Sequence, residues 1–204
     1  MQPELHARPQ YLAALAEIAR RIAASLANVA PQALPIRMYI AGGSALHLYT
    51  GSRVTRDVDA AFSHRIALPD DLEVSYPAED GNAALLYFDR NDNDTLGLLH
   101  EDAYDNAIPI ALHGVDRAVR DVRLLSPLDL AVSKLGRFSS QDREDIRTLA
   151  RSGLINADTL RQRARRSAGP LHRQSGPPAG QHQHRVPGHH SALKHNCRKG
   201  RRSN

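Results

Sequence analysis

Asp57 and Asp59 are the residues of this sequence with the clearest capacity for chemistry. They stand one residue apart, where the apolar segment 58–62 is predicted to form a buried strand. Because alternate side chains of a strand point to the same face, both carboxylates can share hard divalent cations while Val58 points into the core. The alternative is a solvated strand edge, where paired acids are common.

A Gly-Gly-Ser segment, Gly42, Gly43 and Ser44, lies upstream between a predicted strand and a predicted helix. Two glycines let the backbone approach a triphosphate closely, and the first amides of the helix offer it unpaired donors and a partial positive charge. We therefore predict a phosphate-binding turn that faces the two aspartates. A plain strand–helix turn is the alternative, and both descriptions can hold at once.

Hydrophobic periodicity places these groups in a series of short elements. Apolar residues at three- and four-residue steps predict an N-terminal helix over residues 11–29, ended by Pro31 and Pro35. Residues 36–41 and 58–62 are predicted strands, with a helix at 44–49 between them. Further strands are predicted over the apolar segments 72–75, 85–88, 96–99, 107–112 and 118–125.

The chain changes to a helical period after these strands. Ser126 and Pro127 supply an N-cap and a first-turn proline for a helix at 128–138. Ser140 is the predicted cap of a second helix that runs to residue 150, Gly153 stops it, and residues 157–165 form a last helix. This order of elements predicts an α/β (α+β) fold in which a mixed β-sheet carries helices on one face.

Charge divides the chain into two parts. Of its 27 basic and 22 acidic residues, no acidic residue follows Asp158, and eight basic residues lie from Arg166 onward. Residues 166–204 are rich in Gly, Pro, Gln, His, Arg and Ser and cannot bury a core, so we predict a disordered basic tail and interpret it as a frame-shifted C-terminus. The globular unit is then residues 1–165, with its core at 36–125 and a helical part at 126–165.

Composition also excludes several classes of protein. Residues 1–165 carry 19 basic against 22 acidic groups, which does not favour a basic domain that tracks nucleic acid. The single cysteine, Cys197, allows neither a disulfide framework nor a Cys-based zinc site. No apolar run approaches the roughly 20 residues of a membrane span, and the N-terminus lacks a secretory pattern. We expect a cytoplasmic protein with no membrane partner.

The ordered motifs resemble those of the minimal nucleotidyltransferases of the DNA polymerase beta superfamily. Gly-Gly-Ser followed after a helix by Asp-x-Asp is the signature of that superfamily, and the spacing here is similar to that of the AbiEii group of type IV toxin–antitoxin toxins. A second block looks like the K-L-x-x-R…D-x-x-D-[LI] motif of the same group. It comprises Ser133, Lys134, Leu135, Gly136 and Arg137, followed by Asp142, Glu144, Asp145 and Ile146.

The resemblance implies roles for individual residues. In this superfamily the first two acids hold magnesium, which assigns Mg²⁺ to Asp57 and Asp59 and the nucleotide phosphates to the Gly-Gly-Ser turn. Lys134 would reach the triphosphate from a facing helix or, alternatively, stay exposed and pair with a neighbour at i−5 or i+3. Arg53 would contact phosphate or balance the charge of the aspartates.

Such enzymes usually place a third carboxylate on an adjacent strand, as the base for the attacking hydroxyl or as a further metal ligand. The predicted strand 95–99 has Gly97 where this acid is expected, and Glu101, Asp102 and Asp105 follow it. We predict Asp102 as the third catalytic residue.

These expectations converge on a magnesium-dependent nucleotidyltransferase that moves a nucleoside monophosphate from an NTP to a hydroxyl of RNA, protein or a small molecule. The AbiEii resemblance implies a toxin with a cognate antitoxin protein as partner. The alternatives are a non-catalytic nucleotide-binding module that acts by interaction, and the decayed product of a nucleotidyltransferase gene.

Overall fold

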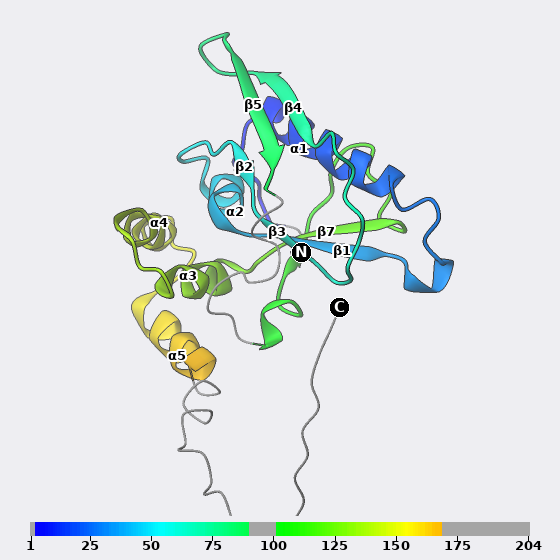
Figure 1. Cartoon of the computed structure of the whole chain (residues 1–204). Helices are drawn as coiled ribbons and strands as arrows, with labels where there is room; N and C mark the ends of the chain where they lie inside the picture. The colour runs from blue at the N-terminus through cyan, green and yellow to red at the C-terminus, as the bar shows by residue number, and fades with distance from the viewer. Residues whose placement is uncertain (1–2, 90–100, 169–204) are drawn as a thin grey trace, which may run out of the picture.

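The computed structural model describes residues 3–89 and 101–168, in which strands of two small sheets are surrounded by helices (Figure 1). The helices are α1 (Pro9–Ala24), α2 (Gly42–Thr50), α3 (Pro127–Leu135), α4 (Ser140–Arg151) and α5 (Ala157–Ala168), with 3₁₀ turns η1 (Pro31–Ala33) and η2 (Glu101–Ala103). The strands are β1 (Ile36–Ile40), β2 (Asp57–Val58), β3 (Ala60–Phe62), β4 (Glu73–Pro77), β5 (Ala83–Phe88), β6 (Ile108–Pro109) and β7 (Arg120–Leu124).

Both sheets are mixed. The first has the strand order β3-β1-β7-β6, in which β1 runs parallel to β7 and antiparallel to β3. The second has the order β2-β5-β4, in which β2 runs parallel to β5 and β5 antiparallel to β4. The α/β class is therefore confirmed, but the strands divide between two sheets where one was predicted.

The predicted strand 58–62 divides between these sheets at Asp59. On one side of this residue, Asp57 and Val58 pair with β5; on the other, Ala60 begins the strand that pairs with β1. The carbonyl oxygen of Asp59 itself accepts a hydrogen bond from Ala41 N–H at 2.8 Å. Asp59 is thus fixed at the point where the two sheets and the turn into α2 meet.

Helix α1 forms for the predicted reason, because its apolar stripe is buried. Leu15, Ile18 and Ile22 are fully buried, and each such aliphatic side chain contributes about 1.5–3 kcal/mol of hydrophobic free energy. The helix lies against the β4–β5 hairpin (Figure 1). It ends at Ala24, earlier than residue 29, because the chain turns at Ser25 and then enters the 3₁₀ turn.

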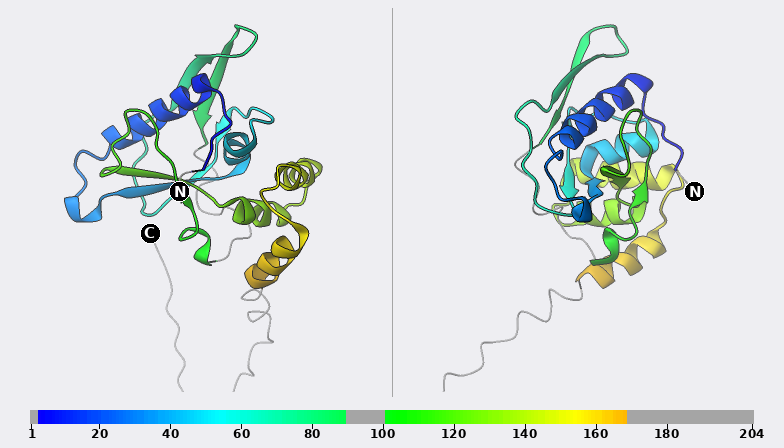
Figure 2. Two further views of the ribbon diagram at one scale, coloured as in Figure 1. Left: turned by 180° about the vertical axis from the view of Figure 1, so that it is seen from behind. Right: turned by 90° about the vertical axis from the view of Figure 1, so that its right-hand side faces the viewer.

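Helix α3 is the centre of the helical part and packs against α2, α4 and α5, away from the β4–β5 hairpin (Figures 1 and 2). Ser126 caps α3 by accepting a hydrogen bond from Asp129 N–H at 3.1 Å, as predicted. The cap of α4 is Ser139 and not Ser140, because Ser139 and Asp142 form a reciprocal capping box.

The remaining boundaries shift by a few residues. The predicted strand 107–112 pairs only at residues 108–109, and the strand predicted at 118–125 is observed at 120–124. Helix α5 extends to Ala168, past the predicted boundary at 165, and Ser167 is buried with its hydroxyl bonded to the Arg163 carbonyl. The predicted strand 96–99 and the tail from residue 169 lie outside the described residues. In the described helices, none combines the length and apolarity required to span a bilayer.

Candidate functional site

Asp59 lies directly against the glycine turn that opens α2. Gly42 has φ +58°, and a Cβ atom added to it would fall 1.6 Å from Asp59 Oδ2. The carboxylate therefore occupies the space that any side chain at position 42 would need. The structure brings Asp59 and Gly42 together as parts of one site.

Asp57 stands beside this turn and is half-buried, whereas Val58 is fully buried. The carboxylate of Asp57 accepts a hydrogen bond from the Thr55 hydroxyl. Its main-chain carbonyl accepts a second one from Ser44 Oγ at 2.7 Å. Alternation along the strand thus places Val58 in the core and leaves both neighbouring carboxylates at the edge of the core.

Ser44 has its hydroxyl committed to the fold. It is fully buried, donates to the Asp57 carbonyl and accepts a hydrogen bond from the Tyr11 hydroxyl at 3.1 Å. Burial raises the pKa of Tyr11, the bond to Ser44 opposes this, and the charges of Asp57 and Asp59 raise it further, so the phenol stays protonated and acts as a donor. The predicted phosphate role of Ser44 is therefore limited to its backbone N–H.

The first turn of α2 has the form of an anion cradle. Ala41, its N-cap, makes no side-chain cap, and the first intrahelical bond runs from Ala45 N–H to Ala41 O at 3.0 Å. The amides of residues 42–44 precede that bond and belong to the unpaired donors of a helix N-terminus. A Cβ at Gly43 would meet Arg53 Nη2 at 3.1 Å and Thr55 Oγ1 at 3.2 Å, so a cation and a hydroxyl flank the same turn.

Lys134 is buried and paired with two carboxylates of α4. Its side chain is 4 % exposed, and its Nζ lies 2.6 Å from Asp145 Oδ2 and 3.8 Å from Asp142 Oδ1. Asp145 also faces Arg53 Nη2 at 3.5 Å. The buried pairing of Lys134 with acids of α4 differs from the predicted alternative of an exposed lysine paired at i−5 or i+3. Arg53, with 43 % of its side chain exposed, is the cation at the cradle.

These features lie within a stretch that matches a known protein family. Residues 17–171 match the model of the family described as "Nucleotidyltransferase of unknown function (DUF6036)". The chain belongs to this family. The match covers the glycine turn, both aspartates and α3 to α5 of this nucleotidyltransferase-family protein.

One solved structure resembles this nucleotidyltransferase-family chain in outline. It is an antigenic nucleotidyltransferase-like protein from Paracoccidioides brasiliensis, with 15% sequence identity and a TM-score of 0.35, over 78% of this chain and 88% of that chain. No curated protein matches the sequence.

Asp89 is a further candidate for the expected third acid, beside the predicted Asp102. Asp102 lies in η2, where its carboxylate is 3.8 Å from Arg163 of α5. On the second sheet, β2 and β5 pair in parallel with Val58 opposite Phe88, and Asp89 N–H bonds to the Val58 carbonyl at 3.3 Å. The paired register ends at these two residues, and Asp89 follows Phe88 directly just as Asp59 follows Val58.

Sequence reasoning passed over Asp89 because the pairing of β5 with β2 is not local. The signal was present as an aspartate directly after the apolar segment 83–88. Within residues 3–89 and 101–168, no three His, Cys, Asp or Glu side chains form a ready metal-binding cluster. Asp57 and Asp59 are hard oxygen donors of the kind that Mg²⁺ prefers.

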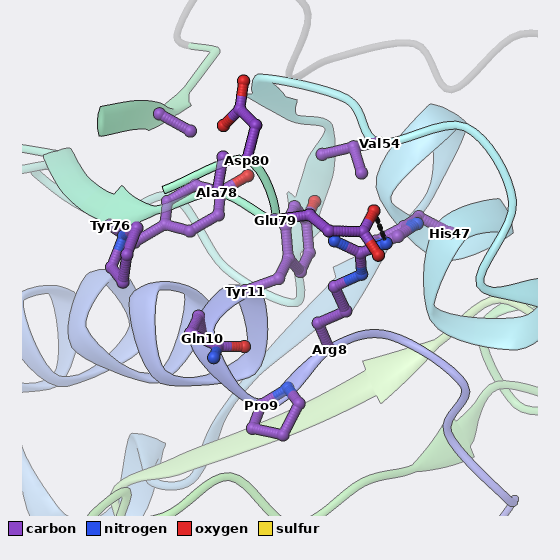
Figure 3. A pocket seen from close by; sticks show the side chains of 12 residues that line it. Arg8, Pro9, Gln10, Tyr11, His47, Val54, Tyr76, Ala78, Glu79 and Asp80 are labelled. Carbon is purple, nitrogen blue, oxygen red and sulfur yellow. Dashed lines mark hydrogen bonds and ion pairs between the residues drawn. The ribbon is translucent and has the colours of Figure 1, made fainter. Parts of the chain in front are cut away.

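A cavity of about 780 Å³ lies beside the site, between the start of α1, the β4–β5 turn and α2 (Figure 3). Tyr11 and His47 form part of its wall, their rings 4.6 Å apart, and Arg8 pairs with Glu79 near His47 (Figure 3). His47 donates from Nδ1 to the Ser52 carbonyl, and burial lowers its pKa, so the imidazole is neutral at pH 7. None of the predicted site residues lines this cavity.

Replacing Lys134 with Ala is expected to destabilise the protein by about 3–5 kcal/mol, because two buried carboxylates would lose their shared cation. Replacing Arg137 with Ala is the matched control. It removes the partner 3.3 Å from Asp142, but its side chain is 75 % exposed, so we expect a loss of at most about 1 kcal/mol. Chemical denaturation measures both, and equal losses would contradict the structural role of Lys134.

Proposed function

We propose that this protein is a magnesium-dependent nucleotidyltransferase that moves a nucleoside monophosphate from an NTP to an acceptor hydroxyl and releases pyrophosphate. The observation that carries the proposal is the seating of the Asp59 carboxylate against Gly42, beside the amides that open α2. Polyphosphate and cation are then held by adjacent groups. The family match supports nucleotidyl transfer in general, and the substrates are part of the proposal.

Each group of the site has a defined task in this mechanism. The amides of residues 42–44 and the guanidinium of Arg53 hold phosphate oxygens. Asp57 and Asp59 would hold Mg²⁺, which when bound offsets negative charge on the triphosphate and on the departing pyrophosphate. Thr55 orients the carboxylate of Asp57 through its hydroxyl.

Transfer itself needs a base near the acceptor. Asp89 would take the proton of the acceptor hydroxyl as its oxygen bonds to the α-phosphorus. The bond from the α-phosphorus to the bridging oxygen of pyrophosphate breaks in the same displacement. Holding donor and acceptor in line is the main contribution of the protein, because the reaction needs no covalent intermediate.

The test is transfer of label from each α-³²P-NTP, with magnesium, to total RNA, total protein or a small-molecule extract. The Asp57→Ala/Asp59→Ala double variant is the control for contaminating activity. Labelled product from the wild type alone supports the proposal. Equal signal from both proteins would refute the transferase proposal. The mixture in which labelled product appears identifies the acceptor class. An AbiEii-like toxin, acting with a cognate antitoxin, would label one such cellular target.

A second candidate is a nucleotide-binding module without turnover. The absence of a ready three-ligand cluster among the described residues favours it, since two aspartates suffice to bind a metal–nucleotide complex but transfer also needs a base. Calorimetry separates the two candidates. Magnesium-dependent NTP binding with no labelled product in any acceptor mixture supports the binding module.

Replacing Asp89 with Asn is expected to lower kcat by about a hundredfold to ten-thousandfold, because the base is lost, with little change in KM for the NTP. Asp102→Asn is the matched variant and should retain activity within about threefold, since Asp102 lies beside Arg163. Initial rates at saturating NTP measure both. If Asp102→Asn lowered kcat more than Asp89→Asn did, Asp102 would be the third catalytic residue.

A further inference from the structure

The helical part of the chain carries positive charge on its surface. Residues 127–168 contain nine basic and five acidic residues, while the described residues before them contain ten basic and fifteen acidic ones. Three of the five acids, Asp129, Asp142 and Asp145, are buried, which leaves Glu144 and Asp158 exposed. The exposed basic side chains are Arg137, Arg143, Arg147, Arg151, Arg161, Arg165 and Arg166.

Three of these arginines form a stripe along α4. Arg143, Arg147 and Arg151 follow one another at four-residue steps, so they share one face of the helix. Glu144 accepts from both Arg147, at 3.3 Å, and Arg151, at 2.8 Å. One carboxylate thus serves two guanidinium groups, and the stripe retains net positive charge.

Phe138 adds an exposed ring to the start of this stripe. Its side chain is 49% exposed, and the Arg143 guanidinium carbon lies 5.6 Å from the ring centroid. Its φ of +50° is a left-handed conformation that strains any residue with a Cβ. The turn therefore holds an aromatic ring in solvent on a backbone conformation that suits glycine better. Burial of the ring in the core does not explain why phenylalanine stands here.

The turn at Phe138 and the arginine stripe also connect, through direct contacts, to the anion cradle at the start of α2. Arg137 lies 3.3 Å from Asp142, which faces the buried ammonium of Lys134. Lys134 bonds to Asp145, and Asp145 faces Arg53 beside Gly43. A ligand held at this turn and stripe would be connected to Arg53 through the same network of ion pairs.

We propose that this corner patch, defined as Arg137, Phe138, Arg143, Arg147 and Arg151, binds single-stranded nucleic acid. Guanidinium groups match phosphates, and an exposed ring among them offers a stacking face for a base. A duplex hides its bases and would use only the charges. The strand bound here would be the acceptor of the transfer reaction, with its terminal hydroxyl as the nucleophile. This last step rests on the proposed function.

The experiment measures fluorescence anisotropy of labelled 15-nucleotide RNA and DNA single strands and of the matching duplex. It uses the full chain, with neither NTP nor magnesium, so that binding is separate from transfer. We expect single strands to bind better than duplex, and the Asp57→Ala/Asp59→Ala variant to bind as the wild type does. Stronger binding of RNA identifies RNA as the ligand, and equal binding identifies a site without sugar preference.

Three variants test the patch itself. Phe138→Ala should weaken single-strand binding about fivefold or more with little change for duplex, and Phe138→Tyr should restore it. Arg143→Glu/Arg147→Glu should weaken binding at least about tenfold in 0.1 M salt and flatten its salt dependence. The matched controls are Leu154→Ala, which removes an exposed apolar side chain, and Arg37→Glu/Arg65→Glu, which changes the charge equally.

Three results would overturn the proposal. If the Arg37→Glu/Arg65→Glu control loses as much affinity, net charge and the basic C-terminal residues account for binding. If Phe138→Ala binds single strands as the wild type does, the ring has no stacking role. If a polyglutamate peptide displaces RNA as effectively as unlabelled RNA does, the patch is a surface for an acidic protein.

Discussion

Asp59→Asn is expected to lower nucleotidyl transfer by about a hundredfold to a thousandfold while leaving the melting temperature within a few degrees of the wild type. The amide has nearly the same shape as the carboxylate and can occupy the same space against Gly42. What changes is the negative charge that would hold Mg²⁺ beside the phosphates. Asp57→Asn should act in the same direction, although it also alters the hydrogen bond from Thr55.

The measurements are the rate of label transfer and a magnesium titration of NTP binding by calorimetry. Asp71→Asn is a matched control, because Asp71 is 79 % exposed and pairs with Arg21 on the surface. It should leave transfer and metal dependence unchanged. If Asp59→Asn kept its dependence on magnesium and lost no more activity than the control, the metal role of this residue would be refuted.

Local patterns were sufficient to predict the parts of the site that are close in sequence. The turn at residues 42–44 opens α2, and Val58 is buried between two carboxylates at the edge of the core, because alternation is a property of the strand itself. The helices were predictable on the same basis, since their apolar stripes and caps lie within one segment. The glycine turn and the strand that carries the two aspartates therefore follow from residues 36–62 alone.

The features of the site that the sequence did not predict depend on pairing between strands that are distant in the chain. The division of the chain at Asp59 between two sheets depends on β5, more than twenty residues later, and the same pairing gives Asp89 its place. The segment 58–62, apolar except for Asp59, contains no sign that its two ends bond to different partners. Alternation specifies which face a side chain takes, but not which strand will lie beside it.

Burial distinguishes the two predicted phosphate-binding cations, Lys134 and Arg53. Lys134 has the right position in its motif to be a phosphate ligand, yet α4 places Asp142 and Asp145 against it and closes it off from solvent. A buried ammonium requires such partners, because an unpaired charge in the core is costly. Arg53 lies on the loop between α2 and β2, beside Gly43, and its exposure leaves the guanidinium accessible to a ligand at the turn.

Gly42→Ala is expected to disrupt the site from the backbone. A methyl group at this position would lie 1.6 Å from Asp59 Oδ2, so the carboxylate would have to leave the turn. The φ of +58° adds a strain of about 1–2 kcal/mol for a residue with a Cβ. We expect lower stability together with a loss of transfer comparable to that of Asp59→Asn.

Gly81→Ala separates these two effects. Gly81 also has a positive φ, +78°, but a Cβ there would meet no atom within 4 Å. It should therefore show the backbone strain of about 1–2 kcal/mol alone, with normal transfer. Denaturation curves and transfer rates of both variants measure the difference, which isolates the contact between the glycine turn and Asp59. If Gly42→Ala were no worse than Gly81→Ala in both measurements, Asp59 could not be seated against the turn, and a cation held there could not bridge to phosphates on α2.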